Sequence, residues 1–186
     1  MEAYYLDDVE TLMEETINQL KGRTAQQWPS IYHRTKTQGM VVQYVGVTKE
    51  GKVLFKTSSG TTPGKWWNQE IYFKDLPTGL KLLQQDPSLT HKAMIHLLQT
   101  GDMLVYCDDL SFKYWGFQYI AWRGGYGLRK ETRYPWKRNP SLKGALCKHL
   151  YLVLSVLPFY TNILVRDLRI KGVLDKDWNK IRKRRL

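Results

Sequence analysis

Apolar residues recur at helical spacing near the start of this chain. Over residues 1–20 they fall every three or four positions, which predicts an amphipathic helix, and Gly22 is expected to end it. Residues 23–39 lack this period and are predicted to form a loop. The helical spacing returns over residues 90–98, so a second helix is expected there, with Gly101 as its C-cap.

Between these two segments the pattern changes to the two-residue period of β-strands. Residues 40–58 are typical of a hairpin with its turn at 49–52, and residues 65–76 of a third strand. A short β-prone run at 104–106 ends at Cys107. These runs predict a small antiparallel sheet.

The C-terminal half returns to helical spacing. Five apolar residues follow the helical period in one segment: Leu146, Leu150, Val153, Leu154 and Leu157. We expect this helix to start at Asn139 as its N-cap, followed by Pro140, and to pack against a hairpin that holds Tyr106 and Trp115. A second short helix is predicted after Pro158, with three residues facing inward: Ile163, Leu164 and Leu168.

Both cysteines of the chain lie in this half, and each has further donor groups close by. Cys107 ends a strand two residues before Asp109, and Cys147 forms a C-x-H pair with His149 at the start of the helix. Small tetrahedral zinc sites are assembled in this way from a hairpin and a helix. The candidate metal ligands are Cys107, Asp109, Cys147 and His149, with zinc as the candidate ion.

Two alternatives to zinc binding stay open. In the first, the same elements form without metal, and Cys107 and Cys147 pack as small hydrophobic residues. In the second, the two cysteines form a disulfide. The second is less favoured, because two cysteines in a chain whose acidic N-terminus is not expected to be a signal peptide indicate a reducing compartment.

The pattern C-x-C, a spacer and C-x-H on a helix is that of the SWIM zinc finger, and this chain resembles a degenerate form of it. Cys107-Asp108-Asp109 stands in place of C-x-C, Cys147-Lys148-His149 matches C-x-H, and the spacer over 110–146 is longer than usual. The flanking words CDDLSFKYWGFQYIAW and RNPSLKGALCKHL also resemble a group of uncharacterised proteins of tailed bacteriophages. The resemblance covers roughly residues 100–170 and implies binding of DNA or proteins rather than catalysis.

Together the elements predict an α+β fold. It has an N-terminal helix, a small antiparallel sheet, a ββα finger-like core and a C-terminal helical segment. Residues 1–100 are expected to form a support of helix and β-hairpin, residues 101–172 the SWIM-like core, and residues 173–186 a basic tail. We expect all three to belong to one compact domain.

Positive charge is concentrated in the C-terminal half. The chain has a formal net charge of +12, to which residues 1–100 contribute 11 Lys/Arg against 10 Asp/Glu and residues 101–186 contribute 18 against 7. A surface of this kind attracts nucleic acid or acidic protein faces. The candidate binding residues are Trp122, Arg123, Arg129, Lys130, Arg133, Trp136, Lys137, Arg138, Lys180, Arg182, Lys183, Arg184 and Arg185.

Aromatic and basic residues interleave over residues 112–136, and three interpretations of this pattern stay open. Bases could stack on the rings while cations neutralise phosphates. The same residue types anchor protein interfaces. A core rich in aromatic residues, with arginines on its outer faces, would also have this composition.

These observations favour a binding or structural role over catalysis. The sequence has no H-E-x-x-H, no serine-histidine-aspartate order and no glycine-rich phosphate motif, so we do not expect an enzyme, and a metal-dependent enzyme is the least favoured hypothesis. The apolar run over 150–165 looks too short to span a bilayer, so no membrane partner is expected.

The leading hypothesis is a non-enzymatic structural or assembly protein of a tailed bacteriophage particle, at the head–tail junction, in the tail or at the baseplate. It would be made in the host cytoplasm, would reside in the virion, and would bind other virion proteins in a larger assembly through a basic, aromatic-rich face. The alternative is a phage-encoded, zinc-finger-like accessory protein that binds DNA.

Overall fold

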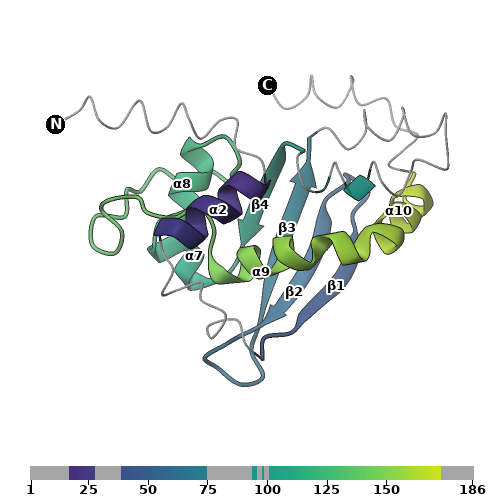
Figure 1. The fold of residues 1–186 in the computed structure, drawn as a ribbon, viewed down its shortest axis with the longest axis horizontal. Coiled ribbons are helices and arrows are strands. Elements are labelled where there is room, and N and C mark those ends of the chain that lie inside the picture. The colour runs from purple at the N-terminus through teal and green to yellow at the C-terminus, as the bar shows by residue number, and fades with distance from the viewer. Residues whose placement is uncertain (1–16, 28–38, 75–93, 96–97, 99–100, 173–186) are drawn as a thin grey trace.

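The computed structural model describes residues 17–27, 39–74, 94, 95, 98 and 101–172 (Figure 1). Its elements, in chain order, are α2 (Ile17–Gln27), β1 (Val42–Val47), β2 (Val53–Ser58), β3 (Trp66–Phe73), β4 (Met103–Cys107), α7 (Leu110–Tyr114), α8 (Phe117–Arg123), α9 (Lys148–Val156), the 3-10 helix η3 (Leu157–Tyr160) and α10 (Thr161–Ile170). The four strands form one antiparallel sheet in the order β1-β2-β3-β4. The predicted α+β class, with a helix before the sheet and helices after it, is confirmed.

The predicted hairpin is present as β1 and β2. Its turn is closed by a hydrogen bond from the Thr48 amide to the Lys52 carbonyl at 2.9 Å and by one from the Gly51 amide to the Thr48 carbonyl at 3.0 Å. The side chains of β2 alternate between the two faces of the sheet, so that Val53 and Phe55 are buried. This hairpin therefore forms where the two-residue period predicted it.

β4 adds the fourth strand beside β3 and joins the two halves of the chain in one sheet. The register places Gln69 opposite Cys107. On its other edge, β4 receives the chain that follows α8, because the Val105 amide donates to the Tyr126 carbonyl at 2.8 Å and the Leu128 amide donates to the Val105 carbonyl at 2.9 Å. Cys107 thus lies at the end of a strand that is held on both sides.

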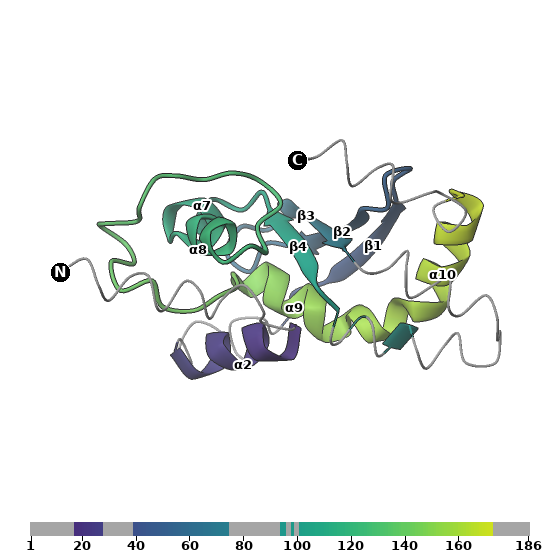
Figure 2. The ribbon, with the colours of Figure 1, turned by 90° about the horizontal axis from the view of Figure 1, so that it is seen from above.

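One face of the sheet is covered by α9, η3 and α10, which run along it in succession (Figures 1 and 2). The four α9 and η3 residues predicted to be buried are buried: Leu150, Val153, Leu154 and Leu157. In α10 the buried residues include Leu164 and Leu168, but Ile163, which was predicted to face inward, is 38% exposed. At about 100° per residue, Ile163 lies about 100° around the helix from Leu164 and about 140° from Leu168, outside the stripe that these two residues form.

The stretch Lys148–Ile170 is long and apolar enough to cross a membrane by length and composition, which the sequence pattern did not indicate. Its inward stripe is nevertheless part of the core of this protein. The stretch is also not one regular α-helix, because η3 interrupts it.

α9 begins at Lys148 and not, as predicted, at Asn139. The Asn139 side chain instead closes a loop, because its Nδ2 donates to the carbonyls of Trp115 at 3.2 Å and Lys143 at 2.9 Å, while its Oδ1 accepts the Lys143 amide at 2.9 Å. Gly144 then has a φ of +76°, which a helix does not allow. The Asn139 side-chain amide makes all three of these hydrogen bonds, so it is not available to cap a helix.

The segment after β4 forms α7 and α8 rather than the second strand of a ββα core. Gly116 separates the two helices with a φ of +78°, and a Cβ at this position would lie 2.3 Å from Cγ of Pro135. Only glycine fits there without displacing the neighbouring loop. Trp115, which was expected on a hairpin with Tyr106, lies instead at the C-terminal end of α7.

α2 continues past Gly22, so the last five residues of α2, predicted to be part of a loop, are helical. Leu20 and Thr24 lie on either side of this glycine, and both are fully buried. Tertiary packing of that face outweighs the cost of one glycine inside the helix, about 1 kcal/mol.

Several predicted elements lie outside the described residues. They include residues 1–16 of the predicted N-terminal helix and the basic tail over 173–186. Of the helix predicted over 90–98, residues 94, 95 and 98 are described, and all three are helical.

Candidate metal centre and binding surface

Three of the four candidate metal ligands converge at the junction of the sheet and α9. Cys107 ends β4, Cys147 is the N-cap of α9, and His149 lies in the first turn of that helix. One ligand atom from each lies within 4.8 Å of the other two, and all three side chains are buried. Both cysteines are free thiols. This buried group of two thiols and one imidazole could hold a metal ion.

The fourth candidate, Asp109, lies against the imidazole. Its Oδ2 is 3.1 Å from Nδ1 of His149, and it also accepts a hydrogen bond from the Ser111 hydroxyl. Neither ring nitrogen of His149 has a hydrogen-bond partner of good geometry, although the side chain is only 1% exposed. A buried polar atom without such a partner costs free energy, so the imidazole is suited to a ligand at this position.

The charges of the four groups depend on one another. Burial raises the pKa of the Cys107 thiol well above its usual value, Cys147 raises it further, and His149 opposes the change. Burial alone would lower the pKa of His149, but the contacts with Asp109 and Cys107 outweigh burial and raise it. Burial would raise the pKa of Asp109, and the contacts with His149 and Ser111 lower it instead. The charged forms of Asp109 and His149 therefore stabilise each other, while burial favours the neutral thiol at Cys107.

Two residues of β3 complete the walls of this centre, and neither was among the predicted site residues. Gln69 is fully buried opposite Cys107, and its Nε2 lies 3.6 Å from the Cys107 sulfur and 2.9 Å from the Thr57 hydroxyl. The Trp67 ring lies 6.1 Å from the His149 ring, centroid to centroid. The strand period offered a signal for Gln69, because it places this amide on the same face as the apolar Ile71.

α2 holds the loop that leads into Cys147. The Thr24 hydroxyl accepts hydrogen bonds from the amides of Ala145 and Leu146, both at 3.1 Å, and the Gln27 side chain accepts one from the Gly144 amide at 2.7 Å. The buried Tyr126 hydroxyl donates to the Ala145 carbonyl at 3.1 Å. The N-terminal helix thus fixes the backbone from which the second thiol projects.

The predicted binding residues do not form a single site. Arg129 pairs with Glu70 and lies 3.5 Å from the centre of the Tyr106 ring, and Arg133 pairs with Glu131. These two arginines are engaged within the chain. Five of the remaining residues are exposed on α8 and on the loops that follow it: Trp122, Arg123, Lys130, Lys137 and Arg138.

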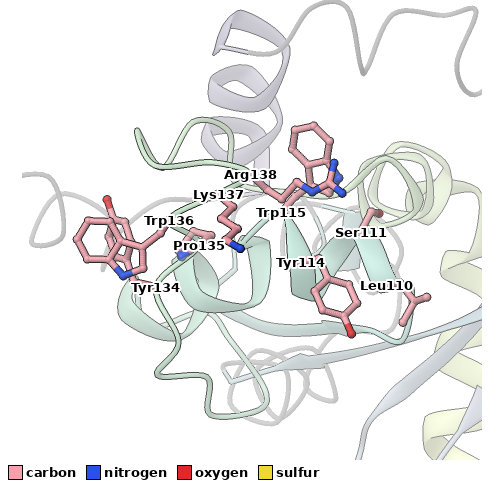
Figure 3. A pocket seen from close by; sticks show the side chains of 9 residues that line it. All are labelled: Leu110, Ser111, Tyr114, Trp115, Tyr134, Pro135, Trp136, Lys137 and Arg138. Atoms are coloured by element: carbon pink, nitrogen blue, oxygen red, sulfur yellow. The ribbon is translucent and has the colours of Figure 1, made fainter.

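Trp136 is 73% exposed and, with Lys137 and Arg138, lines a pocket of about 690 Å³ (Figure 3). The pocket is also lined by Tyr114 and Trp115, two aromatic residues that were not among the predicted binding residues. The remaining predicted residues lie in the tail outside the described residues: Lys180, Arg182, Lys183, Arg184 and Arg185.

Comparison with protein-family models, with curated proteins and with solved structures finds no match to this chain. The SWIM and bacteriophage resemblances therefore stay predictions from the sequence. The arguments that follow use the geometry of the chain itself.

Proposed function

We propose that this protein is a non-enzymatic structural and assembly protein, in which a zinc centre joins the C-terminal helices to the sheet and so fixes a basic, aromatic-rich face that binds neighbouring proteins. The observation that carries the proposal is the burial of Cys107, Cys147 and His149 at the point where β4 meets α9. A cation held there would cross-link two elements that are 40 residues apart in the chain, which is what structural zinc sites do.

The donor set suits zinc. Thiolates and imidazoles are its preferred ligands in proteins, and a carboxylate oxygen binds it at a similar distance. Asp109 lies outside the group of ligand atoms within 4.8 Å of one another, but its Oδ2 is 3.1 Å from Nδ1 of His149. A carboxylate in contact with a metal-binding imidazole orients the ring and increases its basicity. We assign Asp109 this supporting role, with Cys107, Cys147 and His149 as the three donors that the chain brings together.

A metal ion at this centre would supply free energy of folding rather than chemistry. Cys107, Cys147 and His149 are each 2% exposed or less, so little room exists for a substrate to approach them. The bound ion would hold the first turn of α9 against β4, next to the Trp67 ring. Burial of the ligands supports a structural rather than a catalytic role.

The place of the protein in a tailed bacteriophage particle rests on the sequence resemblance over residues 100–170. The exposed aromatic and basic residues at the end of α8 support the proposal that it binds other virion proteins there. Trp122, on the last turn of α8, is 40% exposed and lies beside the exposed Arg123. Tryptophan and arginine are enriched among the residues that dominate the energy of protein interfaces.

The metal centre can be tested on the purified full-length chain by elemental analysis and thermal unfolding. We expect one zinc ion per chain, loss of zinc in Cys147→Ser and His149→Gln, and a lower melting temperature after chelation. His91→Gln, which changes a histidine outside the described residues, serves as the matched control and should keep the zinc. The zinc proposal would be contradicted if the chain, produced in a medium that contains zinc, is purified without metal. Its melting temperature would then also be unchanged by a chelator.

The assembly role needs a separate measurement. A mass-spectrometric inventory of particles of the phage that encodes this chain should find it at a fixed ratio to the other virion proteins. Trp122→Ala with Arg123→Gln should lower that ratio, while the zinc content of the chain stays that of the parent. Detection in the lysate but not in purified particles would refute the virion role and leave the metal centre unaffected.

A further inference from the structure

The pocket beside α7 combines exposed aromatic rings with cations. Trp136 is 73% exposed and Tyr114 is 57% exposed, values that are high for such large rings. Figure 3 shows the Lys137 side chain between these two residues. Two flat apolar surfaces with a positive charge between them are therefore open to solvent.

The Trp136 ring is supported from one side. The Tyr134 ring lies 4.4 Å from it, centroid to centroid, and the Tyr119 ring packs edge-on against Tyr134 at 5.4 Å. Contacts of this kind limit the motion of the indole, so less conformational entropy is lost when a ligand stacks on it. The exposed indole is thus a preorganised surface on which a flat ligand can stack.

The cations of this region outnumber its acidic groups. Residues 110–143 contain eight Lys/Arg and one Asp/Glu, which is Glu131. Glu131 is bound by Arg133, whose guanidinium and backbone amide both donate to it. Within the described part of the chain no ion pair involves Lys137 or Arg138. The pocket therefore attracts a ligand that is itself negatively charged.

We propose that this pocket binds a short stretch of single-stranded nucleic acid, with bases stacked on Trp136 and Tyr114 and phosphates against Lys137 and Arg138. Every base has a flat face, and every linkage between nucleosides carries a charge, so one strand satisfies both features of the pocket. The inference goes beyond the proposed function, because it requires neither a bound metal nor a neighbouring virion protein.

Two other ligand classes fit the pocket less well. The bases of a duplex are covered on both faces by their neighbours, so the exposed rings could not stack on them, and the five-residue α7 is short for a helix that reads a groove. An acidic peptide would neutralise the cations, but its carboxylates offer the two aromatic rings no flat partner. A single strand uses the rings and the charges together.

The test measures binding of a fluorescein-labelled oligothymidylate of about 12 nucleotides to the full-length chain, by anisotropy over a series of salt concentrations. Trp136→Ala should weaken binding about 5- to 150-fold, the range expected for the loss of one stacked base. Lys137→Gln with Arg138→Gln should reduce the slope of log affinity against log salt by about 1.4, which corresponds to two fewer neutralised phosphates.

A matched pair of substitutions controls for net charge. Arg169→Gln with Lys171→Gln removes the same charge from two exposed positions, one in α10 and one just beyond it, at the opposite end of the molecule from α7 in Figures 1 and 2. This variant should keep the affinity within about twofold and the salt slope unchanged. If Trp136→Ala does not fold, Tyr114→Ala repeats the stacking test at a second exposed ring.

Three results would overturn the proposal. The first is oligothymidylate binding that is absent at low salt or unaffected by loss of the exposed rings. The second is duplex DNA of equal length that binds as tightly as the single strand. The third is displacement of the oligonucleotide by poly-glutamate of the same total charge, which would indicate that the pocket binds an acidic protein surface. The zinc content of each variant separates these results from a failure of the metal centre.

Discussion

Replacement of Thr24 by valine tests whether α2 fixes the loop that carries Cys147. Valine has nearly the shape of threonine, so the change removes one hydroxyl and leaves the packing almost intact. That hydroxyl is fully buried and accepts the amides of Ala145 and Leu146, both at 3.1 Å, while it donates to the Leu20 carbonyl at 2.7 Å. The substitution leaves two buried amides without an acceptor.

The expected loss of stability follows from the two amides that lose their acceptor. A buried donor that loses its partner costs about 1–3 kcal/mol, so Thr24→Val should lower the free energy of unfolding by about 2–4 kcal/mol after some relaxation of the loop. Thr24→Ser keeps the hydroxyl and loses one methyl group, and should cost about 1 kcal/mol. Thr132→Val changes an exposed threonine and should stay within about 0.5 kcal/mol of the parent.

Urea denaturation of the full chain measures the free energy of unfolding, and amide hydrogen exchange locates the effect. In Thr24→Val the amides of Ala145 and Leu146 should exchange faster than in the parent, by a larger factor than the amides of β2. If Thr24→Val is as stable as Thr24→Ser and the two amides keep their protection, the hydrogen bonds do not hold the loop, and the argument for the role of α2 fails.

Three further outcomes are expected. Leu154→Ala, at a side chain that is 2% exposed, should lower the free energy of unfolding by about 2–5 kcal/mol in the same urea assay. The hydrogen bond from Arg133 lowers the pKa of Glu131 from 4.5 to about 2, so this carboxylate stabilises the fold above pH 4.5, and its contribution is lost as the pH falls towards 2. Glu131→Gln should therefore be less stable than the parent at pH 7, with the difference shrinking in urea titrations from pH 5 to pH 2. Gly116→Ala should destabilise the chain by about 1–3 kcal/mol, because the added Cβ would displace Pro135. Pro135 lines the pocket, so the same change should weaken the binding of any ligand there.

Local periodicity predicted which faces of the elements are buried. The two-residue period placed β1, β2 and β3 correctly, and the helical period identified the buried stripe of α9 down to Leu154. Both predictions succeed for the same reason. The side-chain direction in a strand or a helix repeats along the chain, so a buried face leaves a periodic trace in the sequence.

Predictions from local sequence were wrong where a contact with a residue distant in the chain decides the conformation. Asn139 has the residue type of an N-cap, but its amide closes a loop that reaches back to Trp115. Gly22 has the residue type of a helix stop, but the buried face of α2 carries the helix past it. In each case a contact between residues far apart in sequence outweighs a preference of about 1 kcal/mol.

The candidate site also combines features that local sequence determines with features that depend on tertiary contacts. The sequence by itself determined the donors, because C-x-H at a helix start and a cysteine at a strand end are local features, and Cys107, Cys147 and His149 do converge. Only the tertiary structure placed Gln69 opposite Cys107, brought Thr24 to the loop before Cys147, and formed a pocket from α7 and the loop that contains Trp136. These relations join elements that no local period connects, because they depend on strand register and on the packing of helices against the sheet.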